Sequence, residues 1–169
     1  MVHGERGWAD LAEAQDGLLS QRTDSVFSTT IGPLSWEQRL WRAVLHAGPD
    51  ALIGGLTAAE VLGPRNWHRE SITVLVTNPL SFDEVEDVSY FRTRRPLTEL
   101  VVPRSQLPVA RIEPAVVLLF AGYERNRSSA HGAIAAAIQQ RLSSPDRMVE
   151  WVDRLRPLRR AKEFRGLAR

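Results

Sequence analysis

Clusters of arginine are the feature of this sequence best suited to chemistry, and that chemistry is the binding of phosphate. A planar guanidinium group matches phosphate oxygens with two parallel hydrogen bonds. The candidate nucleic-acid-binding residues form one cluster at the end of an expected strand and another near the C-terminus: Arg92, Arg94, Arg95, Arg154, Arg156, Arg159, Arg160, Lys162 and Arg165. The competing interpretation is a solvated surface whose arginines pair with Glu150, Asp153 and Glu163.

The charge distribution draws attention to the second of these clusters. The formal net charge of the 169 residues is +2. Residues 141–169 carry nine basic and four acidic side chains, whereas the preceding residues carry more acids than bases. Lys162 is the only lysine, and a GC-rich genome produces the same arginine bias. The number of arginines is therefore weak evidence by itself.

The residue types needed for catalysis or metal binding do not form a recognisable pattern. The chain has no cysteine, which excludes disulfides, thiolate metal sites and cysteine nucleophiles. The four histidines are not spaced as a metal pair on one helix: His3, His46, His68 and His131. No pair of acidic and basic groups has the spacing of a general acid and base, and Glu99 is isolated. We therefore expect no enzyme activity, no metal site and no cofactor.

An acidic run precedes one of the expected strands. It contains Asp83, Glu84, Glu86 and Asp87 but lacks the glycine turn of a calcium loop. We expect a solvated loop there, away from any nucleic-acid surface, because carboxylates repel phosphates. The pair Gly54-Gly55 is likewise too short for a phosphate-binding loop.

The elements that must position the arginines follow a simple order of helices, short strands and helices again. Ser35 with Gln38, and Thr57 with Glu60, form capping boxes that predict two helix starts. Alternation with period two predicts strands at 72–77 and 88–93, and further short strands are expected at 100–102 and 109–112. Residues 18–34 are expected to be a loop with one short strand at Val26-Phe27.

Helices return in the C-terminal half of the chain. Pro114 suits the first turn of a helix through Ala121, and Ser144 can cap a later helix that Pro157 ends. The segregated order predicts an α+β fold, with a small antiparallel sheet of about three to five strands, helices packed on it and a helical C-terminal part. The N-terminus is neither a signal peptide nor a membrane anchor, so we expect a cytoplasmic protein without membrane contact.

Several segments resemble a known family, the actinobacterial AbiEi-type antitoxins of type IV toxin–antitoxin systems, including relatives with a Vsr-like nuclease domain (DUF559). The most specific similarity is Gly-Pro-Leu-Ser-Trp-Glu-Gln-Arg-Leu-Trp at 32–41. Further similarity lies at 57–59, 72–74, 111–116, 135–142 and 158–160. The resemblance implies a winged helix-turn-helix followed by a middle α+β domain.

The departures from the family pattern bear on function. Residues 1–31 resemble only the first helix of the winged helix, and too few residues follow for the recognition helix and wing. Residues 32–169 correspond to the middle domain with its basic helical C-terminus, and the nuclease domain of longer relatives has no counterpart. The first hypothesis is therefore a non-catalytic regulatory domain that binds a protein partner, such as a cognate toxin, or a second copy of itself. The alternatives are a DNA-binding regulator that uses the arginine-rich C-terminus, and a remnant of a Vsr-like nuclease protein.

Overall fold

The chain folds as a small α+β domain, which confirms the predicted fold class. The computed structural model describes residues 20–23, 26–28, 32–63, 71–77, 84–123 and 127–168. Residues 1–19, with His3 and most of the segment that resembles the first helix of a winged helix, lie outside these ranges, as does His68. Among the described residues, no helix is both long and apolar enough to cross a bilayer.

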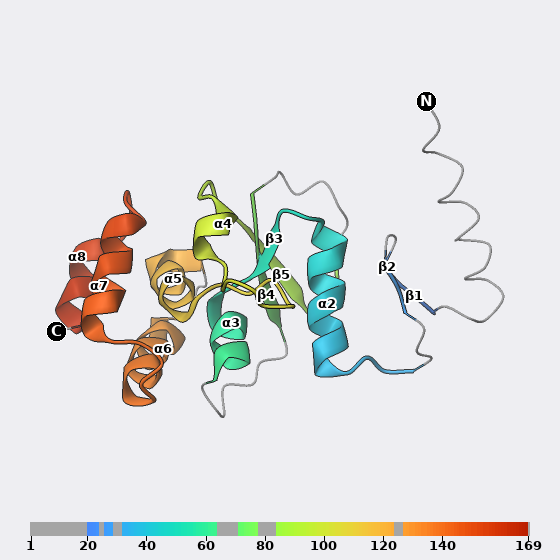
Figure 1. Ribbon diagram of the computed structural model, residues 1–169, viewed down its shortest axis with the longest axis horizontal. Helices are drawn as coiled ribbons and strands as arrows, with labels where there is room; N and C mark the ends of the chain where they lie inside the picture. Colours follow the sequence, from blue (N-terminus) through green and yellow to red (C-terminus); the bar gives the residue numbers. More distant parts are fainter. Residues whose placement is uncertain are drawn as a thin grey trace.

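A three-stranded sheet in the order β3-β4-β5 lies at the centre of the domain (Figure 1). Its strands are β3 (Ala51–Ile53), β4 (Ile72–Val76) and β5 (Val88–Arg92). β3 runs antiparallel to β4, but β4 and β5 are parallel. The prediction of a wholly antiparallel sheet is therefore wrong. The chain between β4 and β5 returns to the end of the sheet at which β4 began, instead of forming a hairpin.

β4 is the central strand, and all five of its residues are buried. Its burial on both faces follows from its position, because α2 (Trp36–Ala47) lies on one side of the sheet and α3 (Gly55–Leu62) and α5 (Ile112–Leu118) on the other (Figure 1). β5 is an edge strand of partly exposed residues, and it ends at Arg92.

The two strands predicted at 100–102 and 109–112 are reduced to isolated bridges. Val109 pairs with Ile53, and Ala110 pairs with Val101. The short helix α4 (Leu97–Leu100) ends at the first residue of the strand that was expected at 100–102. Pro103 and Pro108 lack the N–H groups that a longer ladder would need, which agrees with the irregular pairing.

The N-terminal parts of α2 and α3 differ in how they are capped. Ser35 and Gln38 form the predicted capping box of α2, with bonds of 2.9 and 3.3 Å. The second predicted capping box is wrong, because Gly54 is the N-cap of α3. The Thr57 hydroxyl accepts a buried hydrogen bond from the Thr73 N–H at 2.9 Å instead. A Cβ on Gly54 would lie 2.6 Å from the Leu75 side chain, so this glycine allows β4 to approach.

The remaining helices follow α5 along the chain. α5 continues into a π-helical turn, η1 (Leu119–Tyr123), and α6 (Arg127–Gln139), α7 (Pro145–Arg154) and α8 (Ala161–Leu167) come after it. They lie beyond α3, on the side of the sheet away from α2 (Figure 1). Ser144 caps α7 as predicted.

A small hairpin precedes α2. Its strands are β1 (Ser20–Thr23) and β2 (Val26–Ser28), paired antiparallel. A strand at Val26 was predicted, whereas β1 occupies a segment expected to be a loop.

Candidate nucleic-acid interface

The fold brings the first predicted arginine cluster and two members of the second, Arg154 and Arg156, to one groove. The groove has a volume of about 530 Å³ and lies between the segment after β5 and the segment after α7. Its lining residues are Arg92, Arg94, Arg95, Pro96, Glu99, Arg154, Leu155, Arg156 and Pro157. Five of these residues are arginines, and Glu99 is the one carboxylate among them. We call this surface the groove.

The end of β5 determines how the first cluster is presented. Thr93 is buried, and its N–H donates to the Val76 carbonyl at 2.8 Å, which continues the pairing with β4 for one residue. Arg92 and Arg94 flank Thr93 and are exposed. Neither has a side-chain partner among the described residues, so both guanidinium groups can bind a ligand without breaking an internal contact.

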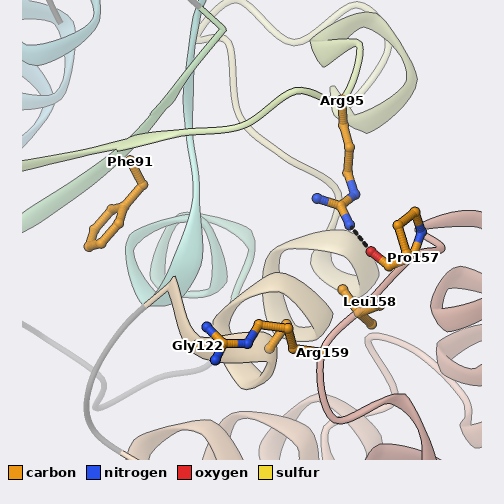
Figure 2. Close-up of a pocket in the computed structure, with 7 residues that line it drawn as sticks. Phe91, Arg95, Gly122, Pro157, Leu158 and Arg159 are labelled. Carbon is orange, nitrogen blue, oxygen red and sulfur yellow. Dashed lines mark hydrogen bonds between the residues drawn. The ribbon is translucent and has the colours of Figure 1, made fainter. Parts of the chain in front are cut away.

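Arg95 has a different role in the same cluster. Its guanidinium donates to the carbonyl of Leu155 at 2.7 Å and to that of Pro157 at 2.9 Å (Figure 2). Its own N–H donates to the Thr93 hydroxyl at 3.2 Å. Arg95 therefore joins the two walls of the groove. Sequence reasoning grouped it with its neighbours because it cannot reveal bonds between residues 60 positions apart.

The second cluster is partly neutralised by nearby acids. Arg154 pairs with Glu150 at 2.6 Å, and Arg156 pairs with Asp153 at 2.6 Å. Arg165 also binds Asp153, at 2.5 Å. The hydrogen bond from Arg165, assisted by the charge of Arg156, holds the pKa of Asp153 below its usual value. Arg154 and Arg156 are more than half exposed, so these ion pairs are weak and a phosphate can replace the carboxylate.

Arg160 belongs to the interior contacts and not to the groove. It donates to the Phe120 carbonyl at 3.0 Å, lies 4.1 Å from the centre of the Phe120 ring and forms two hydrogen bonds with Glu163. The bonds with Glu163 raise the pKa of Arg160. Lys162 is exposed on α8 and lines neither the groove nor the pocket beside it.

A smaller pocket, which we call the hollow, adjoins the groove. It has a volume of about 310 Å³ and shares Arg95 and Pro157 with the groove. Its lining residues are Phe91, Arg95, Ala121, Gly122, Pro157, Leu158 and Arg159. Figure 2 shows Phe91 on one side and Pro157 and Leu158 on the other. Phe91 and Gly122 were not among the predicted site residues, because nothing in the local sequence signals a pocket there.

The acidic run before β5 has a structural role that the sequence did not predict. Asp87 accepts hydrogen bonds from Arg39 and Arg42 of α2, with an Arg39 Nε to carboxylate distance of 2.8 Å. We call these three residues the Asp87 cluster. The expectation of a solvated loop is therefore wrong for Asp87, whereas Glu84 and Glu86 are exposed as expected.

Two other buried polar groups of the described chain, His46 and Glu113, make contacts within the fold. His46 is buried at the end of α2 beside Tyr90, with ring centres 6.4 Å apart. The buried Glu113 binds Ser143 at 2.9 Å and Arg147 at 2.8 Å, and thereby links α5 to the start of α7. In the part of the chain that the structure describes, no group of three or more acidic, histidine or cysteine residues could hold a metal ion.

The comparisons with known proteins identify a structural relative but no family. No protein-family model matches the chain, and no curated protein matches it significantly. The chain is similar to the crystal structure of the RV2827C protein from Mycobacterium tuberculosis, with a TM-score of 0.58 and 12% sequence identity. The alignment covers 98% of this chain and 66% of that protein. At this identity the likeness shows a shared fold, and the resemblance to AbiEi-type antitoxins stays a prediction.

Proposed function

We propose that this chain is a non-catalytic binding domain whose groove binds the phosphate backbone of nucleic acid. The observation that carries the proposal is that the three arginines of the strand cluster meet Arg154 and Arg156 of the C-terminal cluster, about 60 positions away in the sequence, in one groove. It favours the DNA-binding alternative over the protein-binding hypothesis that the resemblance placed first.

The availability of the guanidinium groups supports a ligand with phosphates. Arg92, Arg94 and Arg159 are exposed and have no side-chain partner within the described parts of the chain. Arg154 and Arg156 add two guanidinium groups in weak, exposed ion pairs. Such cations release counterions when they bind phosphates, which makes the affinity strongly dependent on salt.

The extent of the cationic surface supports a polymer over a single small anion. The groove and the hollow share Arg95 and Pro157, so the surface continues from Arg92 to Arg159. Adjacent phosphates of one strand can each meet a different arginine along this surface. The exposed carboxylates of Glu84 and Glu86 precede β5, whereas the arginines follow it.

Association with a protein partner or a second copy stays a prediction. The large exposed apolar residues among those described are Leu45 on α2, Val61 on α3 and Leu167 on α8. α2 and α8 lie on opposite sides of the central sheet (Figure 1). These residues do not define an apolar patch that would favour this alternative.

The test compares two double variants that remove the same charge. In the groove variant, Arg92→Gln and Arg94→Gln remove two unpaired cations. In the control, Arg104→Gln and Arg141→Gln remove two exposed cations that line neither the groove nor the hollow. We expect the groove variant to weaken DNA binding about tenfold and to lower the slope of log affinity against log salt by about two. Absence of DNA binding at low salt, or equal losses in both variants, would contradict the proposal.

A further inference from the structure

The hollow differs from the groove in its chemistry. Phe91, Ala121, Pro157 and Leu158 give it apolar walls. Arg95 and Arg159 complete the lining with guanidinium groups. Phosphate groups gain nothing from the apolar walls, so backbone binding alone does not account for the hollow.

The size and surroundings of the hollow suit a flat organic group. Its volume of about 310 Å³ lies at the lower end of the range for pockets that hold small organic ligands, about 300–1,000 Å³. Phe91 lies on one side of the hollow, and Pro157 and Leu158 lie on the other (Figure 2). An unpaired nucleobase has apolar faces for such walls, and its edge carries oxygens and nitrogens that accept hydrogen bonds from guanidinium groups.

The hollow lies beside the groove, so a flat group bound in it would lie next to the surface that we propose to bind phosphates. Arg95 and Pro157 belong to both the hollow and the groove, so a group in the hollow lies next to the cationic surface. In a nucleic-acid strand, each base is attached to a backbone with a phosphate on either side. A base in the hollow therefore places its own phosphates in the groove.

Internal bonds shape the hollow before any ligand arrives. Arg95 fixes the Pro157 carbonyl on one side. On another, Gly122 breaks the helical path of η1 with a φ of 110°, a conformation that disfavours any side chain. A pocket that exists in the free protein costs little conformational entropy when a ligand binds.

We propose that the hollow binds one unpaired base of single-stranded nucleic acid, whose phosphates lie in the groove. The inference rests on the proposed function and goes beyond it, because phosphate binding alone does not distinguish a single strand from a duplex. A base stacked within a duplex cannot enter the hollow unless it leaves the helix.

The experiment compares two single strands that differ only in their bases. One probe is a thymine oligonucleotide of about 12 nucleotides, and the other has the same backbone with abasic sites throughout. We expect the wild-type protein to bind the thymine strand about tenfold more tightly than the abasic strand at the same salt concentration. Thymidine 5′-monophosphate, tested alone, should bind far more weakly, because it presents only one phosphate.

A variant of the hollow makes the test specific. Phe91→Leu keeps an apolar side chain and removes the aromatic ring. We expect it to bind the thymine strand as weakly as the wild type binds the abasic strand, with the affinity for the abasic strand unchanged. The unchanged affinity also shows that the variant is folded. The double variant Arg92→Gln/Arg94→Gln should instead weaken the binding of both strands.

The outcomes separate the two proposals. Equal affinity of the wild type for the two strands, or equal losses for both strands in Phe91→Leu, would overturn the base-binding inference and leave phosphate binding intact. Monophosphate binding as tight as that of the thymine strand would overturn the assignment to a strand. Failure of both strands to bind at low salt would overturn the proposed function together with the inference that rests on it.

Discussion

Arginines and carboxylates lie together at both ends of β5, yet the two arrangements differ. Before the strand, the carboxylate of Asp87 accepts hydrogen bonds from Arg39 and Arg42, and all three side chains are at most a quarter exposed. At the other end, Arg92 and Arg94 are exposed and have no side-chain partner in the part of the chain that the structure describes, and Glu99 is the one carboxylate in the lining of the groove. The first end holds α2 against the sheet, and the second presents charge to the solvent at the surface where we propose that a ligand binds.

This difference shows why the number of arginines does not indicate function. An arginine whose N–H groups all donate to the protein can bind a phosphate only by breaking those hydrogen bonds, which lowers stability. An exposed arginine without a partner contributes little to folding and is available for binding. Adjacent residues can differ in this way. The Arg95 side chain stabilises the fold through its hydrogen bonds to the main chain, whereas the Arg94 side chain is exposed.

The largest effect on stability is expected for Arg95→Gln. This change removes the two hydrogen bonds to the carbonyls of Leu155 and Pro157, and glutamine is too short to replace them. We expect the free energy of unfolding to fall by about 2–3 kcal/mol, measured by denaturant titration. Arg94→Gln is the matched control, with an expected change within about 0.5 kcal/mol. Equal unfolding midpoints for these two variants would remove the distinction between a structural and an available arginine.

The second prediction concerns the Asp87 cluster. Asp87→Asn keeps a residue that tolerates the φ of 67° at this position, but it removes the charge that both arginines bind. We expect a loss of about 1–2 kcal/mol, less than for a fully buried pair because the side chains are partly exposed. Glu86→Gln is the control, because this adjacent carboxylate is exposed. If the Asp87 cluster contributes to stability, Asp87→Asn unfolds at a lower denaturant concentration than Glu86→Gln. Equal midpoints would show that it does not.

The order of the elements and the strongest local signals could be predicted from the sequence. The capping box at Ser35 and the cap at Ser144 depend on residues close in the chain, and both are confirmed. The parallel pairing of β4 with β5 could not be predicted, because it depends on the path of the whole connection between them. Thr57 shows the same limit, since its hydroxyl binds the Thr73 N–H on the neighbouring strand instead of capping a helix.

The candidate site was predictable as a set of residue types but not as a surface. The sequence singled out the arginines of the groove, including Arg92 and Arg156, because charge clusters are visible along the chain. It did not predict that Arg160 binds Phe120 and Glu163, because those contacts need coordinates. The hollow was missed for the same reason.

A third prediction uses the single carboxylate of the groove. Glu99→Gln removes a negative charge from a surface that we propose to bind phosphates, and Glu99 is exposed. We expect DNA affinity to rise about threefold at moderate salt, because the charges are separated by solvent and partly screened. Glu37→Gln on α2 removes the same charge away from the groove and should leave the affinity unchanged. An equal gain in both variants would indicate a general effect of net charge.

The smallest effect at neutral pH is expected for Tyr90, which lies beside the Asp87 cluster. Its hydroxyl donates to the Ala43 carbonyl at 3.3 Å. Burial raises the pKa of Tyr90 to about 12 from the usual 10.0; the nearby Arg42 opposes this rise and Asp87 adds to it. Absorbance of tyrosinate should show one of the two tyrosines of the chain titrating near 12, and Tyr90→Phe should abolish that transition.

The sign of the associated stability change follows from the direction of this pKa shift. Below pH 10.0 the phenol is protonated in both the folded and the unfolded chain, so Tyr90 makes no difference to the pH dependence. Above that pH the unfolded chain loses the proton first, and the free energy of unfolding falls until the pH passes the folded pKa of about 12. The wild type should therefore lose stability more steeply than Tyr90→Phe across this window. If the free energy of unfolding fell equally with pH in the two proteins, the Tyr90 hydroxyl would be as accessible to water as the arginines of the groove. The Asp87 end of β5 would then not differ from the groove end in its burial.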